Sequence, residues 1–343
     1  MRAKAILKQA GGAVLALLLI AWVLHESDPA RIWEQLKRAS WVGLLGAAAL
    51  NLGHNVFRVW RWRALLEPER AGIPFRPMFS AVMLGYMTSW VIPGRLGELV
   101  RPALLAGREN LPLGACLGSV VADRLLDGLA VLALFALGMQ VAPLQGEAMS
   151  LIPGLRTGAL VLVALVGAVV ATLAAVASFE HRAGALLARR GPLGWVARFA
   201  VAVSRGVRAL RRPRLLLRVG LQSTLAWGAI VVASWIGIRS CGADIGLWDT
   251  MILMPLLVLG ISVPTPGGAG GYHAAMTFGL TRLFGVDPAV AVGAGFLMHA
   301  LVVVPTIGLG LVLLTLDRLP FGDLVRAARQ IRELGSEPVE RPS

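Results

Sequence analysis

Charged residues and cysteines are scarce in this chain. Only 15% of its 343 residues are charged and 57% are hydrophobic, whereas soluble domains carry about 25% charged residues. The two cysteines, Cys116 and Cys241, stand alone and indicate neither a disulfide framework nor a zinc site. The low charge and the recurring apolar runs exclude an ordinary soluble globule, so we predict an integral membrane protein.

Acidic residues are also few, with 19 against 33 basic residues, and the formal net charge is +14. The basic residues lie in short segments between apolar runs and not in a separate basic module. In a membrane protein such segments mark cytoplasmic connections and contact anionic lipid headgroups. We therefore expect an anionic membrane lipid as the partner and no nucleic acid.

Several apolar stretches have the length that a bilayer crossing requires. The predicted crossings cover about 6–24, 41–60, 113–142, 155–178, 217–238 and 288–316. The first also resembles a signal peptide, but no small-residue cleavage site follows it, so we expect a retained helix. The Arg-rich segments 61–76 and 179–216 and both termini then lie in the cytoplasm, and the charge-balanced segment 25–40 lies outside.

Two shorter apolar stretches, 77–92 and 248–263, each end in a Pro/Gly string that is followed by a second short helix. The predicted turn residues are Pro93, Gly94 and Gly97 in the first string and Pro266, Gly267, Gly268, Gly270 and Gly271 in the second. Backbone that breaks at membrane depth must be covered by protein or by water. We therefore predict two re-entrant hairpins, whose glycines serve either tight turning alone or anion binding through backbone N–H groups.

Together these features predict an all-α polytopic membrane protein with six transmembrane helices plus two re-entrant helical hairpins arranged as an inverted repeat. Residues 1–321 would form one transmembrane domain, and 322–343 a short cytoplasmic tail. The repeats would cover about 41–142 and 217–316, with 179–216 as a cytoplasmic linker. Inverted repeats are common in alternating-access carriers.

Four polar residues interrupt the second predicted crossing. Their spacing of i, i+3, i+4 and i+7 places them on one helical face. They are Asn51, His54, Asn55 and Arg58. Such a stripe should face the bundle interior, because exposure to lipid costs several kcal/mol. It either contacts a transported ligand or holds helices together, with Arg58 reaching the cytoplasmic surface in the second case.

A cluster of ionisable residues follows the first Pro/Gly string. Its members are Arg95, Glu98, Arg101, Asp123, Arg124 and Asp127. Glu98 and Arg101 have the spacing of an ion pair, and the two aspartates share a face and need cations to neutralise them. The cluster either binds an anionic headgroup, which the planar fork of arginine suits, or forms a structural ion-pair network.

Motifs of enzymes are missing from the sequence. There is no Asp-x-Asp pair, no His-Glu-x-x-His and no Gly-x-x-x-x-Gly-Lys phosphate loop. We therefore expect no catalytic residue, no metal, no cofactor and no enzyme activity. His273 is the residue that we consider for a proton-linked role, against simple hydrogen bonding.

Four strings of residues resemble those of a known family. They are Arg58-x-x-Arg61-Trp62 with Leu65-Leu66, Pro93-Gly94-Arg95-Leu96-Gly97-Glu98 with Arg101, Asp123-Arg124-Leu125-Leu126-Asp127, and Pro266-Gly267-Gly268-Ala269-Gly270. The chain resembles the flippase-like, lysylphosphatidylglycerol-synthase transmembrane-region family. The resemblance implies movement of aminoacylated phosphatidylglycerol or polyprenyl-phosphate-linked lipids between leaflets, and places the functional groups in the charge cluster.

The chain departs from that family in two respects. The members that aminoacylate lipids carry a soluble synthase domain, which is not found here, so the resemblance does not imply synthase activity. Where an acidic residue often follows the second glycine string, this chain has His273. Some relatives are called glycosyltransferases, but the missing Asp-x-Asp pair argues against that activity here.

The sequence therefore predicts an anionic-lipid flippase of a bacterial inner membrane. One alternative is a membrane-embedded transferase that uses a lipid-phosphate donor. Another is a non-catalytic subunit that binds a partner through segment 179–216. The oligomeric state stays open, with a homodimer as one option.

Overall fold

The computed structural model describes residues 14–22, 24, 29–92, 96–141, 213–263, 265–324 and 326, with single positions between 153 and 171. All elements in these ranges are helices, as predicted. They are α2 (Pro29–Arg38), α3 (Trp41–Leu66), α4 (Phe75–Val91), α5 (Gly97–Glu109), α6 (Leu113–Val141), α10 (Pro213–Ser240), α11 (Leu247–Ser262), η1 (Pro266–Gly268), α12 (Gly271–Phe278), η2 (Gly279–Leu283) and α13 (Pro288–Leu316).

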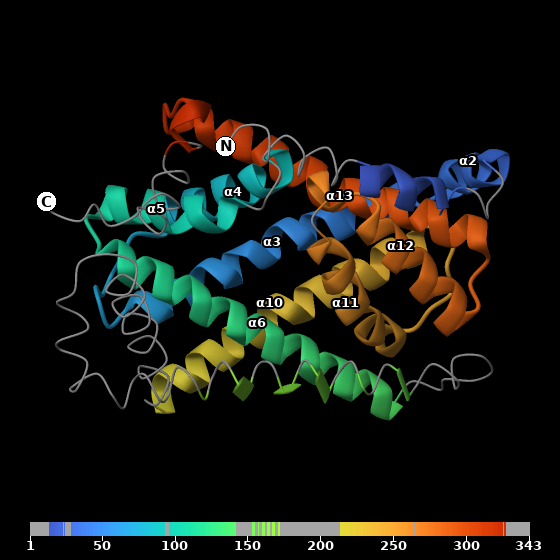
Figure 1. Cartoon of the computed structure of the whole chain (residues 1–343), viewed down its shortest axis with the longest axis horizontal. Coiled ribbons are helices and arrows are strands. Elements are labelled where there is room, and N and C mark those ends of the chain that lie inside the picture. Colours follow the sequence, from blue (N-terminus) through green and yellow to red (C-terminus); the bar gives the residue numbers. More distant parts are fainter. Residues whose placement is uncertain are drawn as a thin grey trace, which may run out of the picture.

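The long helices α3, α6, α10 and α13 extend along the longest dimension of the molecule (Figure 1). Among the described helices, α10 and α13 are long and apolar enough to cross a membrane. The bounds of α13 agree with the predicted crossing 288–316. The predicted crossings 6–24 and 155–178 fall partly or mostly outside the described residues, so six crossings stay a prediction.

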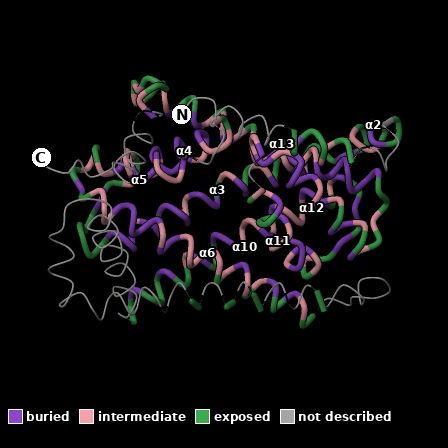
Figure 2. The backbone as a smooth tube through the Cα atoms, viewed as in Figure 1, coloured by how far each residue is buried: buried purple, intermediate pink, exposed green. Residues whose placement is uncertain are grey.

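Helix α3 is longer than predicted: it continues past residue 60 and ends at Leu66. The apolar residues of its last turns, Val59, Trp62 and Leu66, pack in a core with α4, α5 and α6, which explains why the helix does not end at Trp60. Arg61 therefore lies inside a helix and is fully buried, and its assignment to a cytoplasmic connection was wrong. Figure 2 shows α3 passing through the middle of the bundle with many buried residues.

Two short helix pairs, α4–α5 and α11–α12, pack at opposite ends of the long helices (Figure 1). At one end, the start of α4 and the end of α5 meet the end of α13, where Ser80 and Arg108 both bond Asp317. At the other end, α2 meets the start of α13 through the ion pair of Arg31 with Asp287 at 2.9 Å. The pair α4–α5 therefore returns the chain to the end of the bundle from which it came.

The structure places both Pro/Gly strings between the helices of these pairs. α4 ends at Val91 and α5 begins at Gly97, whereas Pro93, Gly94 and Arg95 lie outside the described residues. In the second string, Pro266 opens the short helix η1, and three glycines have positive φ angles, at Gly267, Gly268 and Gly270. Those angles are costly for residues with a Cβ atom, so glycine is needed there.

The end of α4 lies next to the second break. A Cβ atom added to Gly267 would lie 3.6 Å from the carbonyl oxygen of Trp90 at the end of α4. His299 of α13 bonds the carbonyl oxygen of Gly267 at 2.8 Å, and its ring lies 5.9 Å from the ring of Trp90. The tips of both helix pairs are therefore joined through α13.

Candidate functional site

Two arginines of α3 contact two aspartates of α6. Arg61 donates from Nε to Oδ1 of Asp123 over 2.8 Å and from Nη2 to Oδ1 of Asp127 over 2.7 Å. Its Nη1 also donates to the hydroxyl of Ser223 on α10 over 3.2 Å. Arg58, one turn earlier on the same face of α3, donates to Oδ2 of Asp127. Arg61 therefore links three helices at one buried point.

A third arginine, Arg101, reaches the same aspartates from α5. Its Nη1 donates to Oδ2 of Asp123 over 3.0 Å, and its guanidinium lies 4.0 Å from the centre of the Trp62 ring. Arg101 is 2% exposed. Its Nε and Nη2 atoms are buried and have no hydrogen-bond partner among the described residues. These two atoms form the guanidinium edge that binds a carboxylate or a phosphate in bidentate fashion.

The fourth arginine, Arg124, lies at the more open side of the cluster, with its side chain 37% exposed. It contacts Glu98 at 3.5 Å, Asp123 at 3.7 Å and Asp127 at 3.2 Å. The predicted pair of Glu98 with Arg101 is wrong, because Glu98 contacts Arg124 and Arg101 turns to Asp123. Spacing on one helix could not show this, since the better partners come from another helix.

The described members of this cluster, which we call the arginine–aspartate cluster, carry four positive and three negative charges. They are Arg58, Arg61, Arg101, Arg124, Glu98, Asp123 and Asp127. Leaving a buried charge without a partner costs several kcal/mol, so the acids need most of these arginines. The net charge of these members is therefore +1. Besides the Nε and Nη2 atoms of Arg101, the Nε of Arg58 and the Nε and Nη2 of Arg124 are buried without a hydrogen bond to any described residue. The cluster can therefore receive one additional anionic group.

Arg61 was missing from the predicted site because the crossing was taken to end at residue 60. The signal was present, since Arg61 follows Arg58 by three residues and Asp123 precedes Asp127 by four. Such spacings place each pair on one helical face, and two facing helices then match two cations to two acids. Arg95, by contrast, lies outside the described residues.

The polar stripe of α3 faces the interior. Asn51, His54, Asn55 and Arg58 are each at most 8% exposed. Two of these side chains bond backbone: His54 Nδ1 contacts the carbonyl of Asn51, and Asn55 Nδ2 donates to the same carbonyl over 3.2 Å. The Oδ1 atom of Asn55 is buried and accepts no hydrogen bond from the part of the chain that the structure describes. Arg58 does not reach the surface, because Asp127 holds it inside.

The second break has apolar surroundings and two histidines. Gly270 donates its backbone N–H to Nδ1 of His273 over 3.1 Å, and the rings of His273 and His299 lie 4.8 Å apart. The ring of Tyr272 lies 5.3 Å from that of His299. His273 therefore holds the start of α12, and its proton-linked role stays a prediction. Among the described residues, no group of three His, Cys, Asp or Glu residues could hold a metal.

The family follows from comparison with known proteins. The model of the lysylphosphatidylglycerol synthase TM region matches residues 9–310. The chain belongs to this family. Membership makes it a membrane protein and agrees with the apolar helices α10 and α13.

A curated relative is "Glycosyltransferase AglD" of Haloferax volcanii. It is 27% identical over 326 residues, which cover 84% of this chain and 51% of the relative. The chain thus spans about half the length of the curated relative that it matches.

The name of this relative contradicts our expectation that the chain is not an enzyme, and it points toward a transferase. The expectation relied on missing motifs, chiefly Asp-x-Asp. A missing motif excludes only the arrangement that it describes, and carboxylates such as Glu98 and Asp123 can come together from different helices without any local string. The argument from motifs was therefore too weak for that conclusion.

Proposed function

We propose that this chain binds the phosphate headgroup of an anionic phospholipid or polyprenyl-phosphate-linked lipid in the arginine–aspartate cluster. It moves that headgroup between leaflets as the lipid-handling membrane part of a transferase. The observation that carries the proposal is the unpartnered Nε and Nη2 edge of Arg101. A buried donor pair without an acceptor costs about 1–3 kcal/mol, which a bound phosphate oxygen pair would recover.

The remaining arginines hold the acids in place during binding. Asp123 keeps both contacts to Arg61 when Arg101 turns toward a ligand, so it is not left as an unpaired buried charge. Arg124, which is partly exposed and contacts Glu98, offers a second cation to the headgroup. The acyl or prenyl chains stay in the bilayer, because only the charged group needs the cluster.

Movement between leaflets requires the cluster to open to each side in turn. The edge of Arg101 is covered in this conformation, so α4–α5 must shift relative to α6 before a headgroup enters. The contact between Trp90 and the second break couples such a shift to α11–α12. We propose that the two pairs act as the inverted hairpins of an alternating-access carrier in a cell inner membrane, with both termini in the cytoplasm.

A second candidate function is glycosyl transfer from a lipid-phosphate donor by the chain itself, which the name of the relative favours. The acceptor hydroxyl would attack the sugar carbon, the bond from that carbon to the phosphate oxygen would break, and the hydroxyl proton would go to a carboxylate. Glu98 suits that role best, because its side chain is 39% exposed and contacts one arginine. The same arginines would stabilise the leaving phosphate.

Lipid movement and sugar transfer can be separated with purified protein in proteoliposomes. We expect wild-type protein to move a fluorescent phosphatidylglycerol between leaflets, and Arg101→Gln to slow it at least about tenfold. Arg218→Gln removes an exposed arginine that pairs with Glu67 on the surface, and serves as the matched control. If labelled polyprenyl-phosphate sugar yields product while no lipid moves, the proposal of movement is wrong and the second candidate holds.

A further inference from the structure

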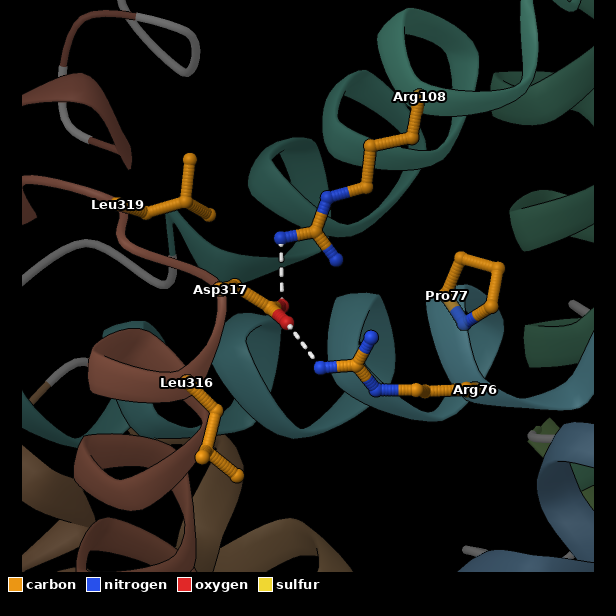
Figure 3. Close-up of a pocket in the computed structure, with 6 residues that line it drawn as sticks. All are labelled: Arg76, Pro77, Arg108, Leu316, Asp317 and Leu319. Carbon is orange, nitrogen blue, oxygen red and sulfur yellow. Dashed lines mark hydrogen bonds and ion pairs between the residues drawn. The ribbon is translucent and has the colours of Figure 1, made fainter.

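A second basic site lies apart from the arginine–aspartate cluster, at the end of the bundle where α4 begins and where α5 and α13 end (Figure 3). It is a cavity of about 340 Å³. The residues that line it are Arg76, Pro77, Arg108, Leu316, Asp317 and Leu319. We call it the terminal pocket. By the distribution of arginines in the sequence, this end is the one predicted to face the cytoplasm.

Two arginines share one carboxylate in the terminal pocket. Arg108 Nη2 lies 2.7 Å from Oδ2 of Asp317, and Arg76 Nη2 lies 3.4 Å from Oδ1. Figure 3 shows the carboxylate between the two guanidinium groups. Ser80 donates its hydroxyl to Asp317 and accepts from Arg108 Nη1 over 2.9 Å. The lining residues therefore carry two positive charges and one negative charge, which leaves a net charge of +1.

The arginine with the weaker contact is open to a ligand. The side chain of Arg76 is 72% exposed, and its Nε and Nη1 atoms make no hydrogen bond to any described residue. Leu316 and Leu319 give the same cavity an apolar side. A cavity with two guanidinium groups and an adjoining apolar wall suits a phosphate group, and in particular one that carries an acyl chain.

The terminal pocket and the arginine–aspartate cluster are connected by the same two helices. Arg101 and Arg108 are seven residues apart on α5, which places them on one face about 10 Å apart along the axis. On α4, Ser80 of the pocket precedes Tyr86 by six residues, or about 9 Å, and the Tyr86 ring lies 5.5 Å from the guanidinium of Arg58. A headgroup released from the pocket would therefore have a short path to the cluster.

We propose that the terminal pocket binds a phosphate group, which displaces the Asp317 carboxylate from Arg76 and Arg108. This phosphate group belongs either to the headgroup of an anionic lipid or to free phosphate. If it belongs to a lipid, the pocket delivers the headgroup to the arginine–aspartate cluster. Only that loading role rests on the proposed function. Phosphate binding itself depends on the pocket alone.

Calorimetric titration of the purified full chain tests the inference. The probes are inorganic phosphate, dioctanoyl phosphatidic acid and, as the uncharged control, dioctanoylglycerol. All titrations use the Arg101→Gln background, which removes the guanidinium edge that is proposed to bind the headgroup in the cluster. The pocket is then read from the difference that the Arg76 and Arg108 variants make in this background, so a failure of the cluster to bind lipid leaves this result interpretable.

We expect Arg76→Gln with Arg108→Gln to weaken phosphatidic acid binding at least about tenfold, and Arg76→Gln alone about threefold. Arg76→Gln leaves Asp317 paired with Arg108 and Ser80, so this variant keeps its fold. Arg218→Gln should stay within about twofold of its parent, because Arg218 does not line the pocket and pairs with Glu67. Asp317→Asn should tighten binding several-fold, since it removes the competing carboxylate.

The probes identify the source of the phosphate. If both inorganic phosphate and phosphatidic acid bind, and the double variant abolishes both, the pocket recognises a lipid headgroup through its phosphate. If inorganic phosphate alone binds, the pocket is a site for free phosphate. Binding of dioctanoylglycerol at the same strength, or phosphatidic acid binding that neither arginine variant changes, would overturn the inference. A purely structural ion pair would show weaker folding in Asp317→Asn and no tightening.

Discussion

The two broken helix pairs share a backbone arrangement and differ in their side chains. In the first pair, a Cβ atom on Gly97 would overlap the carbonyl oxygen of Gly85, and in the second, a Cβ atom on Gly271 would overlap that of Gly260. Both pairs therefore pack backbone against backbone next to their breaks. The two pairs lie at opposite ends of the bundle (Figure 1).

The helices that follow the breaks have different chemistry. α5 carries Glu98 and Arg101 into the arginine–aspartate cluster, whereas α12 carries Tyr272 and His273 into an apolar core. The same backbone thus serves a charged site in one pair and a packed aromatic contact in the other. In the proposed function, this difference corresponds to ligand binding at α4–α5, with α11–α12 as the partner that follows its movement.

The largest expected effect comes from the arginine that joins both aspartates. Arg61→Met should lower the free energy of unfolding by about 3–5 kcal/mol, because Asp123 and Asp127 lose their main buried cation. Thermal unfolding in detergent measures it. A melting temperature equal to that of wild type would mean that the other arginines neutralise the aspartates without Arg61.

The close approach of the two helix pairs can be tested in both at once. Gly97→Ala and Gly271→Ala should each cost about 1–3 kcal/mol, since the added methyl group meets backbone that cannot turn away. Gly107→Ala on α5 is the matched control, because nothing lies within 4 Å of its added Cβ atom. It should be neutral or stabilising by up to about 1 kcal/mol. If only one of the first two variants is destabilised, the two helix pairs do not share the close backbone packing described above.

The histidine at the second break should have a smaller effect. His273→Ala removes the acceptor for the N–H of Gly270 and should cost about 1 kcal/mol, as loss of a helix cap does. Lipid binding should be unchanged, while His273→Asn should restore part of the stability. A variant that loses headgroup binding but keeps its melting temperature would instead place His273 in the ligand site.

The smallest effect is the pH dependence of the terminal pocket. Burial alone would raise the pKa of Asp317, but the Ser80 hydroxyl and the guanidinium groups of Arg108 and Arg76 lower it below its usual value of 3.8. A lowered pKa in the folded state means that ionised Asp317 stabilises the protein above about pH 5. This contribution falls as the pH drops through 3.8 and disappears below the folded-state pKa.

The melting temperatures of wild type and Asp317→Asn measure that contribution. Their difference should be constant between pH 6 and 7 and should shrink as the pH is lowered toward about 3.5. A difference that grows on acidification would show that the carboxylate is held protonated, contrary to the contacts described.

The sequence predicted the features that depend on local pattern. The crossing at 288–316 and the breaks after Val91 and Ser262 follow from apolar length and from Pro and Gly, which act within a few residues. The aspartates of α6 and the polar stripe of α3 follow from helical spacing. Each of these signals lies on one element, so it can be recognised in the sequence without knowledge of the fold.

Features that depend on packing between elements were missed. Glu98 has a cation at the right spacing on its own helix, yet it contacts Arg124 on α6. Asp317 meets Arg108 across 209 residues, so no local pattern could reveal the terminal pocket. α2 was missed because segment 25–40 is balanced in charge and too short for a crossing.

The central claim is that Arg101 binds the headgroup while Arg61 holds the fold. The direct test is the initial rate of leaflet-to-leaflet movement of a fluorescent phosphatidylglycerol by Arg101→Gln in proteoliposomes, with its melting temperature measured on the same sample. We predict a rate at least about tenfold below wild type, since two charge-assisted hydrogen bonds to the headgroup are lost. The melting temperature should change by less than about 4 °C, because Asp123 keeps Arg61. Movement at the wild-type rate by this variant would contradict the account.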